Sequence, residues 1–341
     1  MARILILGGT RNLGHVTALS MLEAGHDVSV LNRGQTPDEL PPEVHRLRAD
    51  RKNDSEMRDA IGPHAFDLIL DDTTYTEADA RQAVSIFRER TARYVFISSG
   101  QVYLIRESAS RPFIESDYDG PVMPAPASDS RDYPDWLYGA DKRNAEHVFR
   151  GAMEHFGFPV TILRLPMVAS ERDHYGRIQG YVERLMDGGP LLIPGDGPGL
   201  PLRHVYVGDV ARFVTALAGT HVGIGDAFNI SYGSSLTLSA FFELLASATR
   251  SEANVIRVER AKLESQGLLP DCSPFSGRWM SELDNSKSMK TFSSIGLEYT
   301  SPDVYIPAIV DDYVKRWIPA GMVPAGYAQR AAELEFAKLS A

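Results

Sequence analysis

Tyr138 and Lys142, in the segment WLYGADKRNAE, are residues of types that can carry out proton transfer together. If the segment is helical, their spacing of four residues places both side chains on one face of the helix. A phenol has a pKa of about 10, so it exchanges protons at neutral pH only when a neighbouring positive charge lowers that pKa. The pair therefore indicates acid–base chemistry at a substrate oxygen, although a tyrosine and a lysine at this spacing are also a common surface pair on helices.

A hydroxyl that could assist Tyr138 lies at the end of an upstream strand. The segment YVFISSGQVY ends its apolar run in Ser98 and Ser99. Because ligands of doubly wound folds bind at the carboxyl ends of the strands, we assign to Ser99 a hydrogen bond to the substrate oxygen. Gln101 is included as a further substrate contact. The alternative is a serine that only satisfies backbone groups where the strand ends.

The N-terminal segment ILILGGTRNLGH predicts a diphosphate site. Glycines between a strand and a helix permit close backbone approach, and the helix N-terminus offers free N–H groups and a positive dipole end. Glycines also simply form turns, so the flanking strand and helix give the motif its meaning. We read it as a nicotinamide-dinucleotide site, whose positive charge when oxidised would lower the pKa of Tyr138 and whose ribose Lys142 would hold. The predicted contacts in the turn are Gly8, Thr10, Arg11, Asn12, Leu13 and Gly14.

Arg11 and Arg33 bear on which dinucleotide binds. A protein that binds the unphosphorylated cofactor usually places an acid at the end of the second strand, where this chain has Asn32 and Arg33. An arginine suits a 2′-phosphate because its guanidinium makes bidentate, charge-assisted contacts. We expect NADP slightly more than NAD, the alternative being arginines that lie over the adenine or face solvent. Asp50, after the third strand, either accepts from the adenine amino group or closes a turn.

The pattern of the chain predicts alternating strands and helices that would position these residues. Short β-rich runs alternate with segments of helical spacing, such as 14–24 and 77–90. Such βαβ units predict an α/β fold, a Rossmann-type doubly wound parallel sheet with helices on both faces. The predicted strands are residues 3–7, 27–31, 44–47, 66–70, 94–98 and 160–165.

The rest of the chain predicts a second, smaller portion. We assign residues 1–165 to a dinucleotide-binding domain to which 203–232 return, and 166–202 with 233–341 to an interleaved substrate-binding portion without a core of its own. Residues 108–136 carry prolines and acids without a period and predict a surface loop, either a wall of the active site or a tolerated insertion. The tail YAQRAAELEFAKL has helical spacing.

Composition excludes several classes of protein. With 35 Lys and Arg against 45 Asp and Glu, the net charge is -10, which disfavours nucleic acid as a partner. The single cysteine, Cys272, excludes a disulfide framework and fits a reducing compartment. The apolar run at the N-terminus is too short for a signal peptide or a membrane span, so we expect a cytoplasmic protein. The adjacent Asp71 and Asp72 make a poor metal site because neighbours on a strand point to opposite faces.

Taken together and in this order, these segments resemble the extended or atypical branch of the short-chain dehydrogenase/reductase superfamily, the NAD-dependent epimerase/dehydratase family. The matching segments are the glycine-rich turn, Asp50, SSGQVY, YGADK, LRLP and RHVYVGDVA. The resemblance implies a Rossmann domain with Tyr138 as the acid–base residue, Lys142 as its electrostatic partner and Ser99 as the substrate-oxygen donor. It also implies a backbone contact to the nicotinamide amide at Pro166.

Departures from the family pattern bear on the reaction. In 4,6-dehydratases the segment that begins at the catalytic serine or threonine resembles Thr-Asp-Glu. Here Gly100 and Gln101 follow Ser99, so the two acids are missing and dehydration is not expected. Pro166-Met167-Val168 stands where nucleotide-sugar epimerases carry an asparagine, whereas Arg203 and the PGDG sequence nearby resemble their substrate-diphosphate contacts. The turn with Arg11 is similar to an atypical subgroup that includes RNA-binding chloroplast proteins.

From the sequence we expect an NAD(P)H-dependent oxidoreductase that reduces a ketone of a small polar or natural-product substrate. A nucleotide-sugar epimerase with bound NAD is the alternative, and a non-catalytic dinucleotide- or RNA-binding scaffold is third. A small-molecule substrate is the expected partner, with no membrane and no metal, and a homodimer is left open.

Overall fold

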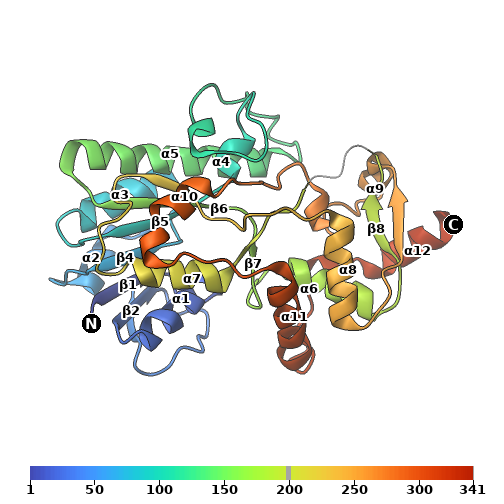
Figure 1. The fold of residues 1–341 in the computed structure, drawn as a ribbon, viewed down its shortest axis with the longest axis horizontal. Helices are drawn as coiled ribbons and strands as arrows, with labels where there is room; N and C mark the ends of the chain where they lie inside the picture. The colour runs from blue at the N-terminus through green and yellow to red at the C-terminus, as the bar shows by residue number, and fades with distance from the viewer. Residues whose placement is uncertain (197–200, 341) are drawn as a thin grey trace.

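A seven-stranded sheet forms the centre of the computed structural model, which describes residues 1–196 and 201–340 (Figure 1). The strand order is β10-β6-β5-β4-β1-β2-β3, and all six neighbouring pairs run parallel. The predicted Rossmann-type α/β class is confirmed. The strands are β1 (Arg3–Leu7), β2 (Asp27–Asn32), β3 (His45–Arg48), β4 (Leu68–Asp71), β5 (Tyr94–Ser99), β6 (Val160–Leu165) and β10 (Ala227–Asn229).

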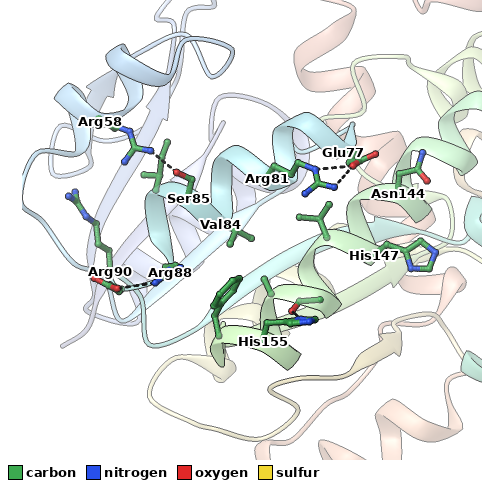
Figure 2. A pocket seen from close by; sticks show the side chains of 16 residues that line it. Arg58, Glu77, Arg81, Val84, Ser85, Arg88, Arg90, Asn144, His147 and His155 are labelled. Atoms are coloured by element: carbon green, nitrogen blue, oxygen red, sulfur yellow. Dashed lines mark hydrogen bonds and ion pairs between the residues drawn. The ribbon is translucent and has the colours of Figure 1, made fainter.

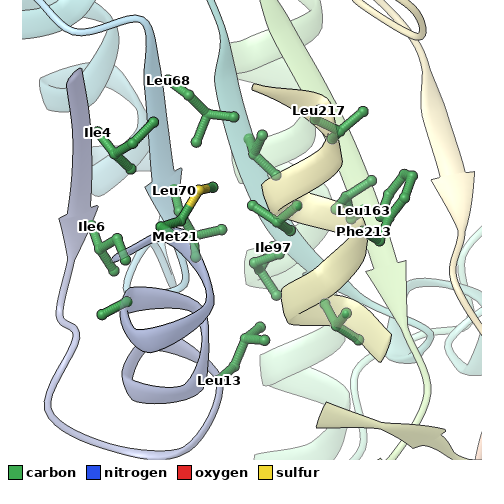
Figure 3. Packing of buried hydrophobic residues seen from close by; sticks show 14 of the residues in the cluster. Ile4, Ile6, Leu13, Met21, Leu68, Leu70, Ile97, Leu163, Phe213 and Leu217 are labelled. Carbon is green, nitrogen blue, oxygen red and sulfur yellow. The ribbon is translucent and has the colours of Figure 1, made fainter. Parts of the chain in front are cut away.

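Helices cover both faces of this sheet. On one face, α1 (Asn12–Glu23) packs against α7 (Val207–Leu217), and Met21, Phe213 and Leu217 meet strand residues such as Leu70 and Leu163 (Figure 3). The other face carries α2 (Asp54–Ile61), α3 (Glu77–Phe87) and α5 (Tyr133–Phe156). Burial from both sides explains why the central strands read as continuous apolar runs.

The predicted boundaries differ from the observed ones by a few residues. Strands 3–7 and 160–165 have the predicted bounds, whereas β4 begins at Leu68 and Phe66 forms only an isolated bridge. The segment RHVYV contains only the short strand β9 (Val205–Tyr206), which pairs with β7 (Val168–Ala169). Helix α7 follows it directly and begins at Val207.

The second portion has a hydrophobic core of its own, which corrects the expectation of none. Its buried cluster includes Tyr181, Phe241, Tyr313 and Trp317. Its elements are α6 (Arg177–Met186), β8 (Leu191–Pro194), α8 (Leu238–Thr249), β11 (Val255–Val258), α9 (Arg260–Ser265), α11 (Pro302–Asp312) and α12 (Arg330–Ser340). The parallel pair of β8 and β11 lies far from the large sheet (Figure 1).

One segment assigned to the substrate portion packs elsewhere. Helix α10 (Ser286–Thr291) contacts β10, and Phe292 is buried against Phe213 and Phe228 of the Rossmann side. The apolar contacts of Phe292 with these rings explain why the segment packs on the Rossmann side. The sequence did not indicate this packing, because an isolated phenylalanine in a polar segment gives no periodic signal.

The stretch 108–136 packs as a folded loop between the two portions. A 3₁₀ turn spans Glu115–Tyr118, and α5 begins at Tyr133, inside the range expected to be a loop. Phe113 and Tyr118 are buried, and the Phe113 N–H donates to the Glu282 carbonyl at 2.8 Å. Helix α12, in the predicted tail, docks on α6 through a buried ion pair between Arg184 and Glu333 at 2.5 Å. Among the described residues, no helix combines the length and apolar character needed to cross a membrane.

Candidate active site

The glycine turn after β1 is shaped to receive a diphosphate. Gly8 and Gly9 have φ values of +107° and +83°, which other residues rarely adopt. A β-carbon on Gly9 would lie 2.5 Å from Val30, and one on Gly14 would lie 2.8 Å from the Gly9 nitrogen. Helix α1 follows without a side-chain cap at Arg11, so its first N–H groups face the turn unpartnered by a side chain in the described part of the chain. These residues fit the pyrophosphate of a dinucleotide.

The other predicted residues of the turn differ in their surroundings. The Leu13 side chain lies in the core, so only its backbone can contact a ligand. Asn12 has a positive φ of 40°, and its buried Oδ1 has no hydrogen-bond partner in the described residues. Thr10 is half-buried. An unpaired buried oxygen at this position is consistent with a ligand in the turn.

Asn32 shapes the turn through both ends of its amide. Its Nδ2 donates to the Gly8 carbonyl at 2.9 Å, and its Oδ1 accepts from the Gly34 N–H at 2.9 Å and from Arg48. These contacts use Oδ1 and one of the two N–H groups of Nδ2, so a cofactor contact of Asn32 stays a prediction.

Three arginines surround the place expected for the adenosine ribose. Arg11 is exposed and donates to Thr36 at 3.3 Å, and Arg33 is exposed without a side-chain partner among the described residues. Sequence reasoning missed Arg48, the register partner of Asn32 on β3. The signal was available, because a residue paired with the end of β2 must lie at the same edge of the sheet.

Asp50 serves a turn in the structure. Its Oδ1 accepts from the Lys52 N–H at 2.9 Å, and its own N–H donates to Glu56 at 2.8 Å. This geometry agrees with the turn-closing alternative, and it leaves Oδ2 of the half-buried side chain for an adenine amino group.

Lys142 is buried on α5 and held by two carbonyl groups. Its Nζ donates to the Thr74 oxygen at 2.7 Å and to the Ile97 oxygen at 2.9 Å, which leaves one N–H for a ligand. The ammonium lies 5.8 Å from the ring centre of Tyr138 and 4.9 Å from that of Tyr75. Burial lowers the pKa of Lys142 to about 8, against the opposing charges of Asp71 and Asp72.

Tyr138 lies one helical turn before Lys142, as the spacing predicted. Burial of the phenol raises its pKa above the ordinary value, and a hydrogen bond with Ser99 opposes this shift only in part. The expected lowering of this pKa by Lys142 together with an oxidised nicotinamide stays a prediction. Because 37% of Tyr138 remains exposed, a substrate can still reach it.

The two serines at the end of β5 face opposite ways. Ser98 donates to Glu146 at 2.6 Å, and Glu146 forms a fully buried ion pair with Arg164 at 2.6 Å. Ser99 is half-buried, faces Tyr138 and accepts from the Gln101 N–H at 3.2 Å. This arrangement agrees with the choice of Ser99 over Ser98. The Gln101 amide is directed to the Asp135 carbonyl at 3.3 Å, so it supports the start of α5.

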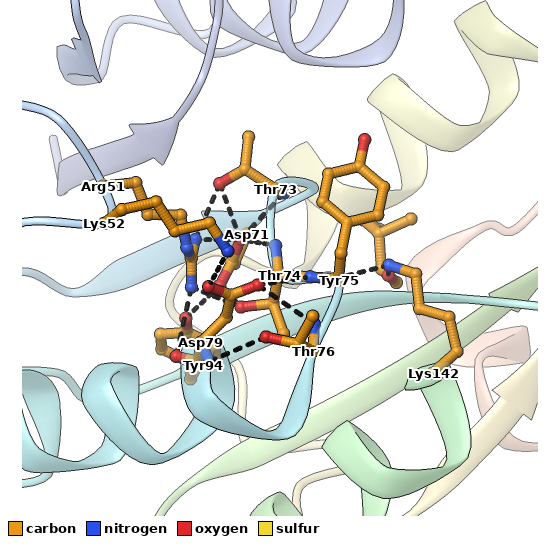
Figure 4. A network of polar contacts seen from close by, with 11 residues as sticks. Arg51, Lys52, Asp71, Thr73, Thr74, Tyr75, Thr76, Asp79, Tyr94 and Lys142 are labelled. Atoms are coloured by element: carbon orange, nitrogen blue, oxygen red, sulfur yellow. Dashed lines mark hydrogen bonds and ion pairs between the residues drawn. The ribbon is translucent and has the colours of Figure 1, made fainter. Parts of the chain in front are cut away.

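Asp71 organises the loop that carries Thr74 (Figure 4). It accepts from Arg51 at 2.8 Å and from the Thr74 hydroxyl at 2.5 Å, and the Tyr94 hydroxyl also donates to it. Burial raises the pKa of Asp71, but the ion pair with Arg51 and these hydrogen bonds outweigh it and bring the pKa to about 2. The described residues contain no cluster of three metal-ligating side chains, and Asp71 is engaged in this network instead.

The predicted contacts Arg203 and Pro166 lie in different settings. Arg203 donates to Ser235 and to the Leu283 carbonyl at 2.9 Å each, and it lies 3.3 Å from Glu282. Its charge is thus already paired, which weakens the expected contact with a substrate diphosphate. Pro166 follows β6 directly, where Leu165 is the register partner of Ser99, so it lies at the catalytic edge of the sheet.

Two cavities lie outside the catalytic group. The first, of about 910 Å³, lies on the outer face of α3 and α5 (Figure 2), and its arginines are largely paired, as Arg81 is with Glu77 at 2.5 Å. The second, of about 840 Å³, lies where the second portion meets the start of α5, and Asp132 is among its lining residues. Asp132 precedes Tyr138 by six residues on α5, about 9 Å along the helix. Of the PGDG segment at 194–197, the last residue, 197, lies outside the described residues.

Comparisons with known proteins agree with this fold. The chain is 23% identical over 260 residues to the chloroplast stem-loop binding protein of 41 kDa b from Arabidopsis thaliana, covering 72% of this chain but only 63% of that protein. The UDP-glucose 4-epimerase of Thermotoga maritima, solved with UDP-glucose, has a TM-score of 0.69 at 20% identity and covers 92% of this chain and 98% of its own. The dTDP-glucose 4,6-dehydratase of Bacillus anthracis, solved with NAD, has a TM-score of 0.71 at 14% identity and covers 92% and 97%.

The family is decided by the match over the Rossmann portion. The profile of the NAD dependent epimerase/dehydratase family matches residues 4–231, which include the glycine turn, Ser99, Tyr138 and Lys142. The chain therefore belongs to the NAD-dependent epimerase/dehydratase family.

Proposed function

We propose that this chain is an epimerase that uses a bound nicotinamide dinucleotide to oxidise and then re-reduce a carbinol carbon of a nucleotide sugar. The observation that carries the proposal is the placement of Lys142, Tyr138 and Ser99 together at the carboxyl edge of the sheet. The sequence favoured net reduction of a ketone, but the family match and the UDP-glucose 4-epimerase fold favour the epimerase.

In this proposal the chain's own groups move and hold a proton. Tyr138 takes the proton of the substrate hydroxyl and later returns it, and Ser99 holds the same oxygen by a hydrogen bond. Lys142 uses its remaining N–H to hold the nicotinamide ribose while Thr74 and Ile97 fix the ammonium. The bound nicotinamide supplies the hydride acceptor and donor.

The second cavity is the proposed site for the charged end of the substrate. Its lining includes Arg257, Arg260 and Arg278 beside Trp279, and Asp132 anchors Trp279 at 2.7 Å. Arg257 has no side-chain partner among the described residues, so it is available to a phosphate. We propose that this cavity, rather than Arg203 alone, receives the diphosphate.

For the cofactor, the family favours NAD, whereas the exposed Arg11, Arg33 and Arg48 favour acceptance of a 2′-phosphate. We propose that the chain binds both dinucleotides. The second candidate function is reduction of a ketone with NADPH. It is favoured by the pairing of Arg203 with Glu282 and by Pro166 in the place of the asparagine expected in nucleotide-sugar epimerases.

The test is turnover of UDP-glucose and UDP-galactose by the purified chain without added reductant. Interconversion by the wild type, with a loss of about 100-fold or more in Tyr138→Phe, supports the epimerase. Consumption of NADPH with a panel of ketones, without interconversion, would replace it by the reductase. Binding of RNA without either activity would favour the scaffold, which the net charge of -10 disfavours.

A further inference from the structure

Asp72, the first residue after β4, lies against the glycine turn. A β-carbon on Gly8 would lie 3.0 Å from its Oδ1, and one on Gly14 would lie 3.3 Å from its Oδ2. The two carboxylate oxygens thus lie against the two glycines that frame the turn. A carboxylate therefore lies beside the turn that the proposed function assigns to a pyrophosphate.

No neighbouring group neutralises this carboxylate by direct contact. In the described part of the chain, the Asp72 side chain has no ion pair and no hydrogen bond to another residue. Arg51 is engaged by Asp71, and Lys142 donates to two carbonyl groups, so both act on Asp72 only from a distance.

Charged groups on several neighbouring elements affect the pKa of Asp72. Asp71 on β4 raises its pKa, while Lys142 on α5 and Arg51 in the loop before α2 lower it. Tyr75 follows in the same loop, and its own pKa is raised to about 12, so it is neutral. The turn itself contributes the positive charge of Arg11, which is exposed and donates a hydrogen bond to Thr36. Burial has the largest effect and brings the pKa of Asp72 to about 7.

We propose that Asp72 makes cofactor binding depend on pH, because its ionised carboxylate repels the cofactor's pyrophosphate at the glycine turn. The inference rests on the proposed function, since it requires the turn to be a dinucleotide site. Two anions in one turn repel each other, so the dinucleotide binds best when Asp72 carries a proton. Binding above neutral pH then takes up a proton from solvent, and a rise in pH favours release.

A different role for Asp72 makes the opposite prediction. If the carboxylate accepted a hydrogen bond from a ribose hydroxyl, it would stay ionised in the complex and its removal would weaken binding. Replacement by asparagine distinguishes the two roles, because asparagine keeps the size of the side chain and cannot ionise.

The test is titration calorimetry of NAD and of NADP with the full chain from about pH 6 to about pH 9, in two buffers of different ionisation enthalpy. For the wild type we expect affinity to fall by up to about tenfold per pH unit above about pH 7, with proton uptake on binding. Asp72→Asn should bind with no such dependence, and about tenfold more tightly than wild type near pH 8. Asp72→Ser is a second variant with the same expectation.

Asp311→Asn is the matched control, because Asp311 is exposed and paired with Lys315 on a surface helix end. It should keep the wild-type pH dependence. Binding by the wild type that does not change with pH, or weaker binding by Asp72→Asn at every pH, would overturn the inference and leave the proposed function standing. Absence of binding by wild type and variants even near pH 6 would overturn both.

Discussion

The Nζ atom of Lys142 donates a hydrogen bond to the carbonyl oxygen of Thr74 at 2.7 Å. The same Thr74 donates its N–H to Asp71 at 2.9 Å and its hydroxyl to Asp71 at 2.5 Å. The ammonium on α5 is therefore positioned by a loop whose shape depends on the buried carboxylate of Asp71. These contacts connect Asp71, at the end of β4, to Lys142 on α5.

The ion pair between Arg51 and Asp71 should be essential for stability. In Arg51→Gln the buried carboxylate of Asp71 loses its charge partner, which should lower the free energy of unfolding by about 3 kcal/mol. Arg81→Gln removes an exposed pair with Glu77 and should cost under about 1 kcal/mol. Denaturant unfolding measures both, and equal small losses would show that Asp71 does not depend on Arg51.

Substitution of Ser98 should affect mainly stability, whereas substitution of Ser99 should affect mainly turnover. Ser99→Ala removes the hydrogen bond at Tyr138 and should lower turnover by about 10-fold to 100-fold with little loss of stability. Ser98→Ala deprives buried Glu146 of a 2.6 Å hydrogen bond and should cost about 1 to 2 kcal/mol of stability while turnover is kept. Kinetics and thermal unfolding of the two variants check this, and the reverse pattern would exchange their roles.

The sequence correctly predicted the strand that ends in Ser99 and the helix that carries Tyr138 and Lys142, because local pattern and topology agree there. Buried parallel strands require continuous apolar runs, so the strand that ends in Ser99 and its place at the catalytic edge could be read from the chain. The spacing of Tyr138 and Lys142 on one helix face follows equally from local geometry.

Other features depend on contacts between distant segments. The pKa of Tyr138 is raised by burial, and burial is a property of the folded surroundings that charge spacing cannot reveal. Asp71 and Asp72 are adjacent in sequence, yet Arg51 stabilises the charge of one and burial disfavours the charge of the other. The pairing of Arg203 with Glu282 joins segments 79 residues apart, so its neutralisation could not be foreseen.

The exposed arginines at the adenosine end should favour the phosphorylated cofactor. Arg33→Ala should lower the affinity for NADP by about 10-fold and leave that for NAD nearly unchanged, because only NADP carries the 2′-phosphate. Arg48→Ala should act on both, since Arg48 also holds Asn32. Calorimetric titrations measure the four affinities, and an equal loss for both cofactors in Arg33→Ala would contradict the proposed contact.

Asp72 should also make the stability of the protein depend on pH. Its pKa is about 7 in the folded chain, above the value of about 3.8 expected when unfolded, so the folded state binds more protons between these values. Stability should fall as pH rises through this range and then stay level. Asp72→Asn should therefore be more stable than the wild type by about 4 kcal/mol near pH 8 and by under about 1 kcal/mol near pH 4. Unfolding at the two pH values checks this, and an equal gain at both would show that ionisation is not the cause.

The central claim is that the phenol of Tyr138 faces the nicotinamide of a dinucleotide whose pyrophosphate lies in the glycine turn. Ultraviolet titration of phenolate tests this claim without a substrate. The signal of Tyr138 is the difference between wild type and Tyr138→Phe, recorded without nucleotide, with NAD⁺ and with NADH. We predict a pKa above the ordinary value for the chain alone and a decrease of about one unit or more with NAD⁺, but not with NADH, because only the oxidised ring is positively charged. An unchanged titration in a protein that demonstrably binds NAD⁺ would contradict the account.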